Sequence, residues 1–199
     1  MKTIRLKTLT LKHFKGVRDF TLETEGKDIS VYGDNRTGKS TLADAVMWLL
    51  FGKDSLNQAN FEIKTIEGGE ALHGLDHAVE ATFAVGKKIV TLRKTYKEQW
   101  VKRRGSAHKE FTGHIVDHAI DGVPVKKKEF DEAVKDICTE DLFRLLSDPR
   151  HFNVNLHWQD RRKMLLAVCG DVSDADVIAS DKDLSGLTAL LNGKSMDDV

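Results

Sequence analysis

The stretch that decides the fold is "VYGDNRTGKSTLADAV", residues 31–46. Within it, residues 33–40 fit the pattern G-x-x-x-x-G-K-S, in which a glycine-rich turn leads from a strand into a helix. An apolar run precedes this pattern, and apolar residues at helical spacing follow it as far as Phe51. This order of strand, turn and helix is the context that distinguishes a phosphate-binding loop from a chance match.

The glycines and the backbone of this loop suit close contact with phosphate. Gly33 lets the chain turn sharply off the strand, and Gly38 lets the backbone approach an anion without a clashing Cβ. The amides from about Asn35 to Thr41 can converge on a β-phosphate, helped by the positive end of the following helix. The predicted nucleotide-binding residues are Gly33, Asp34, Asn35, Arg36, Thr37, Gly38, Lys39, Ser40 and Thr41.

Two side chains of the loop carry its predicted chemistry. Lys39 can reach the β- and γ-phosphates, so it is the predicted catalytic residue. Ser40 can offer its hydroxyl to Mg²⁺ and is therefore a predicted metal ligand. The loop thus predicts ATP and Mg²⁺ as the species bound.

Composition argues against several broad classes of protein. The 199 residues include 31 Lys plus Arg and 31 Asp plus Glu, and this balance is unlike that of a polycationic nucleic-acid binder. Cys138 and Cys169 match no metal-ligand spacing, which favours a reduced, cytoplasmic setting. The N-terminus lacks an apolar signal region, and the longest apolar run, "AVMWLLF", is too short to span a bilayer. No membrane partner is expected.

Hydrophobic periodicity predicts strands on both sides of the loop. Residues 3–12 read as a strand with a bulge, because the apolar alternation slips between Leu6 and Leu9. An antiparallel strand, a short buried strand and the helix of the loop follow, at residues 17–25, 28–33 and 38–51.

The remainder predicts a β-rich insert followed by helices. After a loop region at residues 53–75, the apolar residues of about 76–125 alternate as in an antiparallel β-meander. From Lys126 the period becomes helical, and helices are predicted within residues 126–170. We expect an N-terminal lobe at residues 1–170 and a short helical segment at residues 171–199 that leads toward a coiled coil.

These motifs resemble the N-terminal head segment of the SbcC, RecF and SMC group of DNA-repair ATPases. That group opens with an apolar strand, an NF-x-x-φ turn (φ, apolar), a second strand, I-x-G-x-N-x-x-G-K-S-T, L-x-D-A-φ and φ-φ-F-G. Here the turn is "KHFKGV", the loop is "YGDNRTGKST" and the helix is "LADAVMWLLFG". The resemblance is specific over residues 3–54 and looser as far as about residue 170.

The resemblance implies an AAA_23-like P-loop head of the ABC class. The implied fold is α/β, a P-loop core of ABC/SMC head type with an added antiparallel β-meander and C-terminal helices. Such proteins bind ATP between two heads, so ATP joins a dimer and hydrolysis releases it. The implied partners are a second head (a homodimer or the C-terminal half), the DNA backbone and a nuclease subunit.

Three departures from the family pattern change what is expected of this chain. The family's Walker B strand, four apolar residues ending in Asp-Glu, is not in the sequence. Neither an LSGGQ-like signature nor a heptad pattern is present. We therefore expect the first half of a head, cut before its coiled coil, which binds nucleotide weakly and hydrolyses it poorly alone.

The family's Q-loop glutamine, a Mg²⁺ ligand, has no clear counterpart. It would fall near residues 147–152, where no glutamine stands. Gln159 is the nearest candidate, although helical patterning favours a surface position for it. Asp148 is an alternative ligand for Mg²⁺.

Three basic groups invite a nucleic-acid reading: residues 102–104, 126–128 and 161–163. The first lies beside Trp100 at a predicted hairpin tip and is the best candidate for contact with DNA phosphates. Because the net charge is zero, solvated charge at turns and helix starts is the favoured interpretation of the three groups.

Two other functions remain open from the residues alone. A P-loop phosphotransferase would carry an arginine-bearing lid and an acceptor pocket. A scaffold would use ATP only to hold an interface together, without releasing phosphate.

Overall fold

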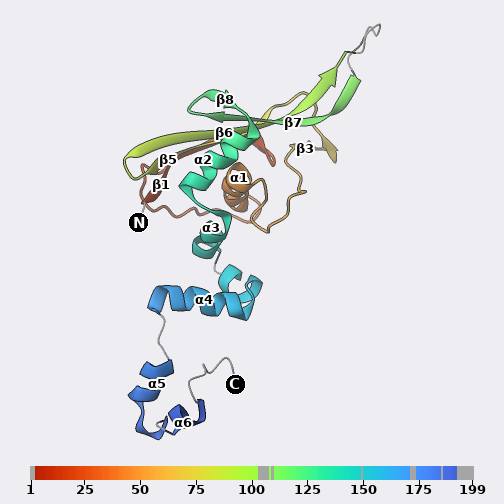
Figure 1. The fold of residues 1–199 in the computed structure, drawn as a ribbon. Helices are drawn as coiled ribbons and strands as arrows, with labels where there is room; N and C mark the ends of the chain where they lie inside the picture. Colours follow the sequence, from red (N-terminus) through yellow and green to blue (C-terminus); the bar gives the residue numbers. More distant parts are fainter. Residues whose placement is uncertain are drawn as a thin grey trace. The chain divides into compact units, whose positions relative to one another are not determined.

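A computed structural model of the chain describes residues 3–102, 108, 110–148, 150–170, 174–184 and 186–191. The chain divides into two compact units, Met1–Glu140 and Asp141–Val199. The N-terminal unit combines a six-stranded sheet with helices (Figure 1), which confirms the predicted mixed α/β class.

The sheet is antiparallel throughout and runs in the order β2–β1–β5–β6–β7–β8. The register of β1 against β5 shifts between Leu6 and Thr8, which confirms the bulge predicted there. A two-stranded hairpin, β3 and β4, forms inside the predicted loop region. The strands are β1 (Ile4–Phe14), β2 (Val17–Glu23), β3 (Ile66–Glu67), β4 (Glu70–Ala71), β5 (His77–Val85), β6 (Lys88–Val101), β7 (Glu110–Ile120) and β8 (Val123–Val125).

Two helices, α1 (Lys39–Phe51) and α2 (Lys127–Ile137), pack against the sheet. The covered face is apolar because alternate strand residues point to it, and its core members are Leu9, Leu11, Val79, Ala81, Phe83 and Leu92. Helix α1 ends at Gly52, whose φ of +72° lets its N–H reach the Trp48 carbonyl at 2.9 Å. This ending is the one predicted for the helix.

The prediction of a buried strand at residues 28–33 is wrong. These residues form no strand, and Ile29, Val31 and Tyr32 are 47, 44 and 89% exposed. A buried strand needs neighbours for both its backbone and its side chains. Among the described residues no strand pairs with this segment, so its apolar side chains lie in solvent.

The described residues of the C-terminal unit are mostly helical, as predicted from the sequence. None of the described helices is both long and apolar enough to cross a bilayer. The expected lobe boundary at residue 170 stays a prediction. The helices are α3 (Glu140–Ser147, which begins at the boundary of the units), the π-helix η1 (His151–Asn155), α4 (Trp158–Cys169), α5 (Asp174–Ser180), the 3₁₀ turn η2 (Lys182–Leu184) and α6 (Leu187–Leu191).

Candidate functional site

The predicted phosphate loop lies where the chain enters α1. Gly38 caps the helix with a φ of +90°, a left-handed conformation that glycine adopts readily. No side chain caps the helix, and its first turn holds no acidic residue. Because a helix start carries unpaired N–H groups and a partial positive charge, an anion is the natural acceptor here.

The side chain of Lys39 folds back over the loop. Its Nζ donates to the carbonyl oxygens of Gly33 at 2.7 Å and Asp34 at 2.5 Å. The Thr37 hydroxyl also donates to the Asp34 carbonyl, at 2.8 Å. A Cβ on Gly33 would lie 2.9 Å from the Thr37 Oγ1, so a larger residue there would require the Thr37 side chain to move. The ammonium group therefore lies close to the loop backbone on exposed, exchangeable partners.

Hydroxyl groups follow the lysine in the first turn of α1. Ser40 is exposed, whereas Thr41 is buried and its N–H donates to the Gly38 carbonyl at 3.0 Å. Asn35 and Arg36 are exposed at the crown of the loop, and Arg36 has a φ of +66°. The loop thus has the composition that phosphate and Mg²⁺ require, and the roles of its residues stay predictions.

Asp44 fixes α1 just beyond the loop. Its carboxylate accepts hydrogen bonds from Lys15 Nζ at 2.5 Å, from the Ser55 N–H at 3.0 Å and from the Ser55 hydroxyl at 2.6 Å. Burial alone would raise the pKa of the Asp44 carboxyl, but the bonds from Lys15 and Ser55 together lower it. The helix that begins at the loop is therefore tied to two other segments of the chain.

The turn that carries Lys15 is held by hydrogen bonds to the segment at residues 63–65. The Lys15 N–H donates to the Ile63 carbonyl at 2.9 Å, and the His13 carbonyl accepts from the Thr65 hydroxyl at 3.1 Å. Val17, which follows the turn, would lie 3.6 Å from a Cβ on Gly38. The β1–β2 turn therefore lies against the phosphate loop.

Sequence reasoning gave Lys15 and Ser55 no role, and it included Asp44 only as the aspartate of the L-x-D-A-φ motif. A charged residue on the apolar face of a predicted helix is the signal that could have found Asp44. Its partners are 29 and 11 residues away along the chain, and no spacing rule predicts them.

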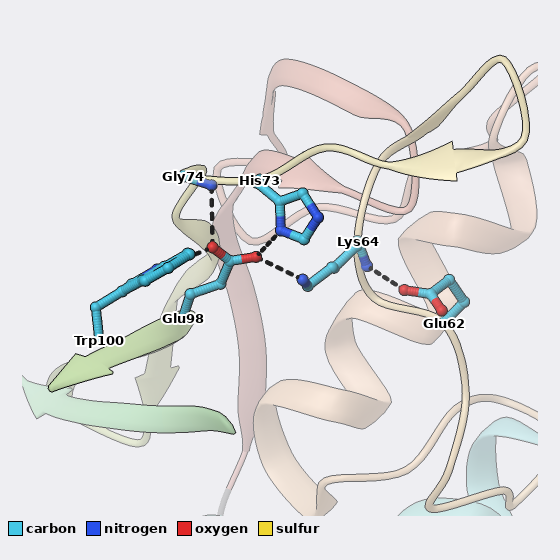
Figure 2. Close-up of polar contacts among 6 residues, drawn as sticks. All are labelled: Glu62, Lys64, His73, Gly74, Glu98 and Trp100. Carbon is cyan, nitrogen blue, oxygen red and sulfur yellow. Dashed lines mark hydrogen bonds and ion pairs between the residues drawn. The ribbon is translucent and has the colours of Figure 1, made fainter. Parts of the chain in front are cut away.

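A second polar cluster surrounds Glu98 on β6 (Figure 2). Its carboxylate accepts hydrogen bonds from Lys64 and His73, both at 2.7 Å, from the Gly74 N–H at 3.2 Å and from Trp100 Nε1 at 3.1 Å. The bond from Lys64 contributes most to lowering the pKa of the Glu98 carboxyl to about 2. This cluster joins the loop before β5 to the far end of β6.

The cluster bears on the predicted DNA contact. Trp100, one of its members, is 46% exposed and packs edge-on against Phe111 with ring centroids 5.6 Å apart. Lys102 follows the end of β6, while Arg103 and Arg104 lie outside the described residues. Contact of this group with DNA stays a prediction.

The remaining candidates lie on helices. Residues 126–128 form the start of α2, and residues 161–163 lie in α4. Gln159 is exposed in the first turn of α4, within the C-terminal unit. Asp148 accepts from the Arg150 N–H at 2.9 Å. Both residues belong to the C-terminal unit, and their role as Mg²⁺ ligands stays a prediction.

Known proteins resemble this chain in sequence and in fold. The AAA_23 family profile, described as "AAA domain", matches residues 8–175. The DNA replication and repair protein RecF of Flavobacterium johnsoniae is 23% identical over 155 residues. That match covers 72% of this chain and 42% of RecF, so the chain spans less than half the length of this curated relative.

A solved structure shares the fold. It comes from work on "ATP-driven dimerization and DNA stimulated activation of SMC ATPases", and it superposes with a TM-score of 0.55 at 14% identity. The match covers 81% of this chain and 97% of that one. The predicted ATPase-head fold is confirmed by this likeness.

Proposed function

Because the chain belongs to the AAA_23 family of AAA domains, the ATPase heads of SbcC, RecF and SMC type, we propose that it binds ATP and Mg²⁺ at residues 33–41. The observation that carries the proposal is the start of α1, where an uncapped helix follows a left-handed Gly38 and an exposed loop. Bound ATP would supply the free energy that changes how heads associate.

The residues of the loop divide the binding between them. The amides from about Asn35 to Thr41 surround the β-phosphate at the positive end of the helix. Lys39 exchanges the carbonyls of Gly33 and Asp34 for β- and γ-phosphate oxygens, which are stronger acceptors because they are charged. Ser40, which is exposed beside it, holds Mg²⁺ through its hydroxyl.

The proposed action is ATP-driven engagement with a second head or with a C-terminal half. The exposed segment at residues 28–33 supports such a partner, because Ile29, Val31 and Tyr32 present apolar surface next to the loop. A strand from the partner would pair with this backbone and cover these side chains. Engagement of this kind is coupled, in the proposal, to DNA binding or to control of a nuclease in recombination and repair.

DNA as a partner is supported by the relative RecF, a DNA replication and repair protein, and a nuclease partner only by the resemblance to the SbcC group. The DNA contact would be to backbone phosphates, without sequence preference, through Lys102 and its neighbours. A cytoplasmic location follows from the same relationship. The family does not favour the phosphotransferase or the scaffold as alternatives.

Replacement of the loop lysine tests the proposal directly. Lys39→Ala should weaken ATP binding by at least about tenfold, since it removes a charge-assisted contact of about 1.5–3 kcal/mol. Isothermal titration calorimetry with Mg²⁺ and a non-hydrolysable ATP analogue gives the affinity. Lys88→Ala, an exposed lysine in the β5–β6 turn region, is the matched control and should bind as the wild type does. Equal affinity in Lys39→Ala, with circular dichroism unchanged, would contradict the site assignment.

A further inference from the structure

Lys94 is a buried cation to which no carboxylate is bonded among the described residues. It lies on β6 and is 6% exposed. Its Nζ donates to the Trp48 carbonyl at 3.0 Å, and the ring centroids of Trp48 and Phe130 lie 6.0 and 5.1 Å from it. An ammonium has three donors, so the Trp48 carbonyl leaves two of them unused. Burying an ammonium with unused donors raises the free energy of the folded state unless another group pairs with it.

Lys94 is surrounded by charges of both signs, and burial has the largest effect on its pKa. The pKa of Lys94 is lowered to about 8, chiefly by burial, while Asp131, acting through space, raises it and the charge of Lys127 lowers it. His118 lies directly opposite on β7, and burial and then the Lys94 charge lower the pKa of its ring. At neutral pH the ammonium is therefore mostly charged, beside a mostly neutral imidazole.

Lys94 and His118 line a cavity of about 900 Å³ between the sheet, the end of α1 and the start of α2. Sites for small organic molecules usually measure about 300–1,000 Å³. Its one lining carboxylate, Asp117, is paired with Lys97 on the neighbouring strand. The apolar part of the lining is formed by Trp48, Ile63, Val116, Ala119, Pro124 and Val125.

The start of α2 adds to the positive potential of the cavity. This 11-residue helix begins after Lys126 without a side-chain cap, and both Lys126 and Lys127 line the cavity. A smaller cavity of about 520 Å³ shares Gly52, Lys94 and Lys127 with the first. Lys94 thus lines both cavities.

This cavity is separate from the phosphate loop. It is lined by residues at the C-terminal end of α1, Trp48 and Gly52, and by no residue of 33–41. The 13 residues of α1 place its two ends about 20 Å apart. ATP at the loop would not fill this cavity.

We propose that the cavity is a second ligand site, for a small organic anion with an apolar body, and that Lys94 is its counter-ion. The acidic group takes the two free donors of Lys94, and the start of α2 adds further N–H groups. The apolar body lies against Trp48 and Ile63. A neutral molecule with the same body leaves the Lys94 charge unpaired and binds more weakly. Nothing in the proposal depends on the function of the phosphate loop.

Three probes with one apolar body test the proposal: naphthoate, naphthyl phosphate and the neutral naphthylmethanol. Calorimetric titration of the whole chain at pH 7 should show tighter binding of at least one anion than of the alcohol. Lys94→Met keeps the side-chain length and removes the charge, so it should weaken anion binding about tenfold or more. It should also fold, because it removes a buried charge.

Two variants separate this site from others. Lys88→Met changes an exposed lysine at the start of β6 that does not line the cavity, and should alter anion affinity by less than about twofold. Lys39→Ala should lose ATP but keep binding of naphthoate, so the two sites fail or succeed independently. Anion binding that is equal in wild type and Lys94→Met, or no tighter than that of the alcohol, would overturn the proposal.

The pKa of Lys94 provides a measurement that needs no variant. NMR of lysines carrying ¹³C-methyl labels follows it in the wild-type chain. Because the anion binds the protonated form, saturating naphthoate should raise this pKa above about 8. Without ligand, burial, Asp131 and Lys127 set the pKa of Lys94, and His118 lies opposite it on β7. No binding of any probe, or a pKa that the bound anion leaves unchanged, would contradict the site.

Discussion

Lys39 and Asp44 lie on the same helix and have opposite surroundings. Lys39 is bonded only to exposed carbonyls of its own loop, which an anion can replace. Asp44 is 5% exposed and accepts three hydrogen bonds from Lys15 and Ser55. One residue is therefore free to change partners, while the other holds the helix in place.

Asp44→Asn should destabilise the chain by about 1–3 kcal/mol. The buried carboxylate accepts hydrogen bonds from Lys15 and Ser55, whereas the amide has one acceptor oxygen and an NH₂ group that cannot accept them. Urea unfolding followed by circular dichroism measures the loss. Asp19→Asn, at an exposed position on β2, is the control and should change stability by less than about 0.5 kcal/mol. Equal stability of the two variants would mean that the Asp44 contacts do not hold α1.

Glu98 gives the fold a dependence on pH of known sign. Its pKa is about 2 in the folded chain against 4.5 for the ordinary side chain. The stabilisation is therefore fully present above about pH 4.5 and is lost as the pH falls toward 2. Wild type should be more stable than Glu98→Gln at pH 7, and the difference should shrink between pH 4.5 and 2. Urea unfolding at a series of pH values checks this, and a gap that does not depend on pH would refute it.

Among the secondary-structure elements, the prediction from sequence differs most from the structure at residues 28–33. The apolar alternation of this stretch resembles a strand, but a strand forms only where a neighbour accepts its hydrogen bonds. The bulge in β1, the end of α1 at Gly52 and the β-meander were all predictable, because their signals are local. The contacts of Asp44 and Glu98 were not, because their partners come from distant segments.

Hydrogen exchange tests this account of the 28–33 segment. Its amides should exchange nearly as fast as in an unfolded chain, because they take part in no sheet. Amides in β5, which has neighbours on both sides, should exchange slowest and serve as the internal control. Addition of a partner that supplies a pairing strand should slow exchange at 28–33. Strong protection in the chain alone would show that the segment is already paired.

At the scale of the whole molecule, the chain carries the phosphate loop of the family heads but not their Walker B and signature motifs. The phosphate loop is present, whereas the sequence has no apolar run ending in Asp-Glu and no signature motif. The relative RecF is also longer, since this chain covers 42% of it. Binding and hydrolysis of ATP are therefore expected to separate in this molecule.

Phosphate release with ATP and Mg²⁺ should be close to that of Lys39→Ala, because the sequence lacks the Walker B carboxylate that orients the attacking water in the family. A coupled phosphate assay on the 199-residue chain gives the rate. Turnover well above the Lys39→Ala background would show that other residues of this chain supply that base.

The central claim is that residues 33–41 hold the phosphates of ATP, and a crystal structure with Mg²⁺ and a non-hydrolysable ATP analogue tests it most directly. The account predicts the β-phosphate within the amides that follow Asn35, with Lys39 Nζ moved from the Gly33 and Asp34 carbonyls to phosphate oxygens. A nucleotide bound elsewhere, with Lys39 still on those carbonyls, would contradict it.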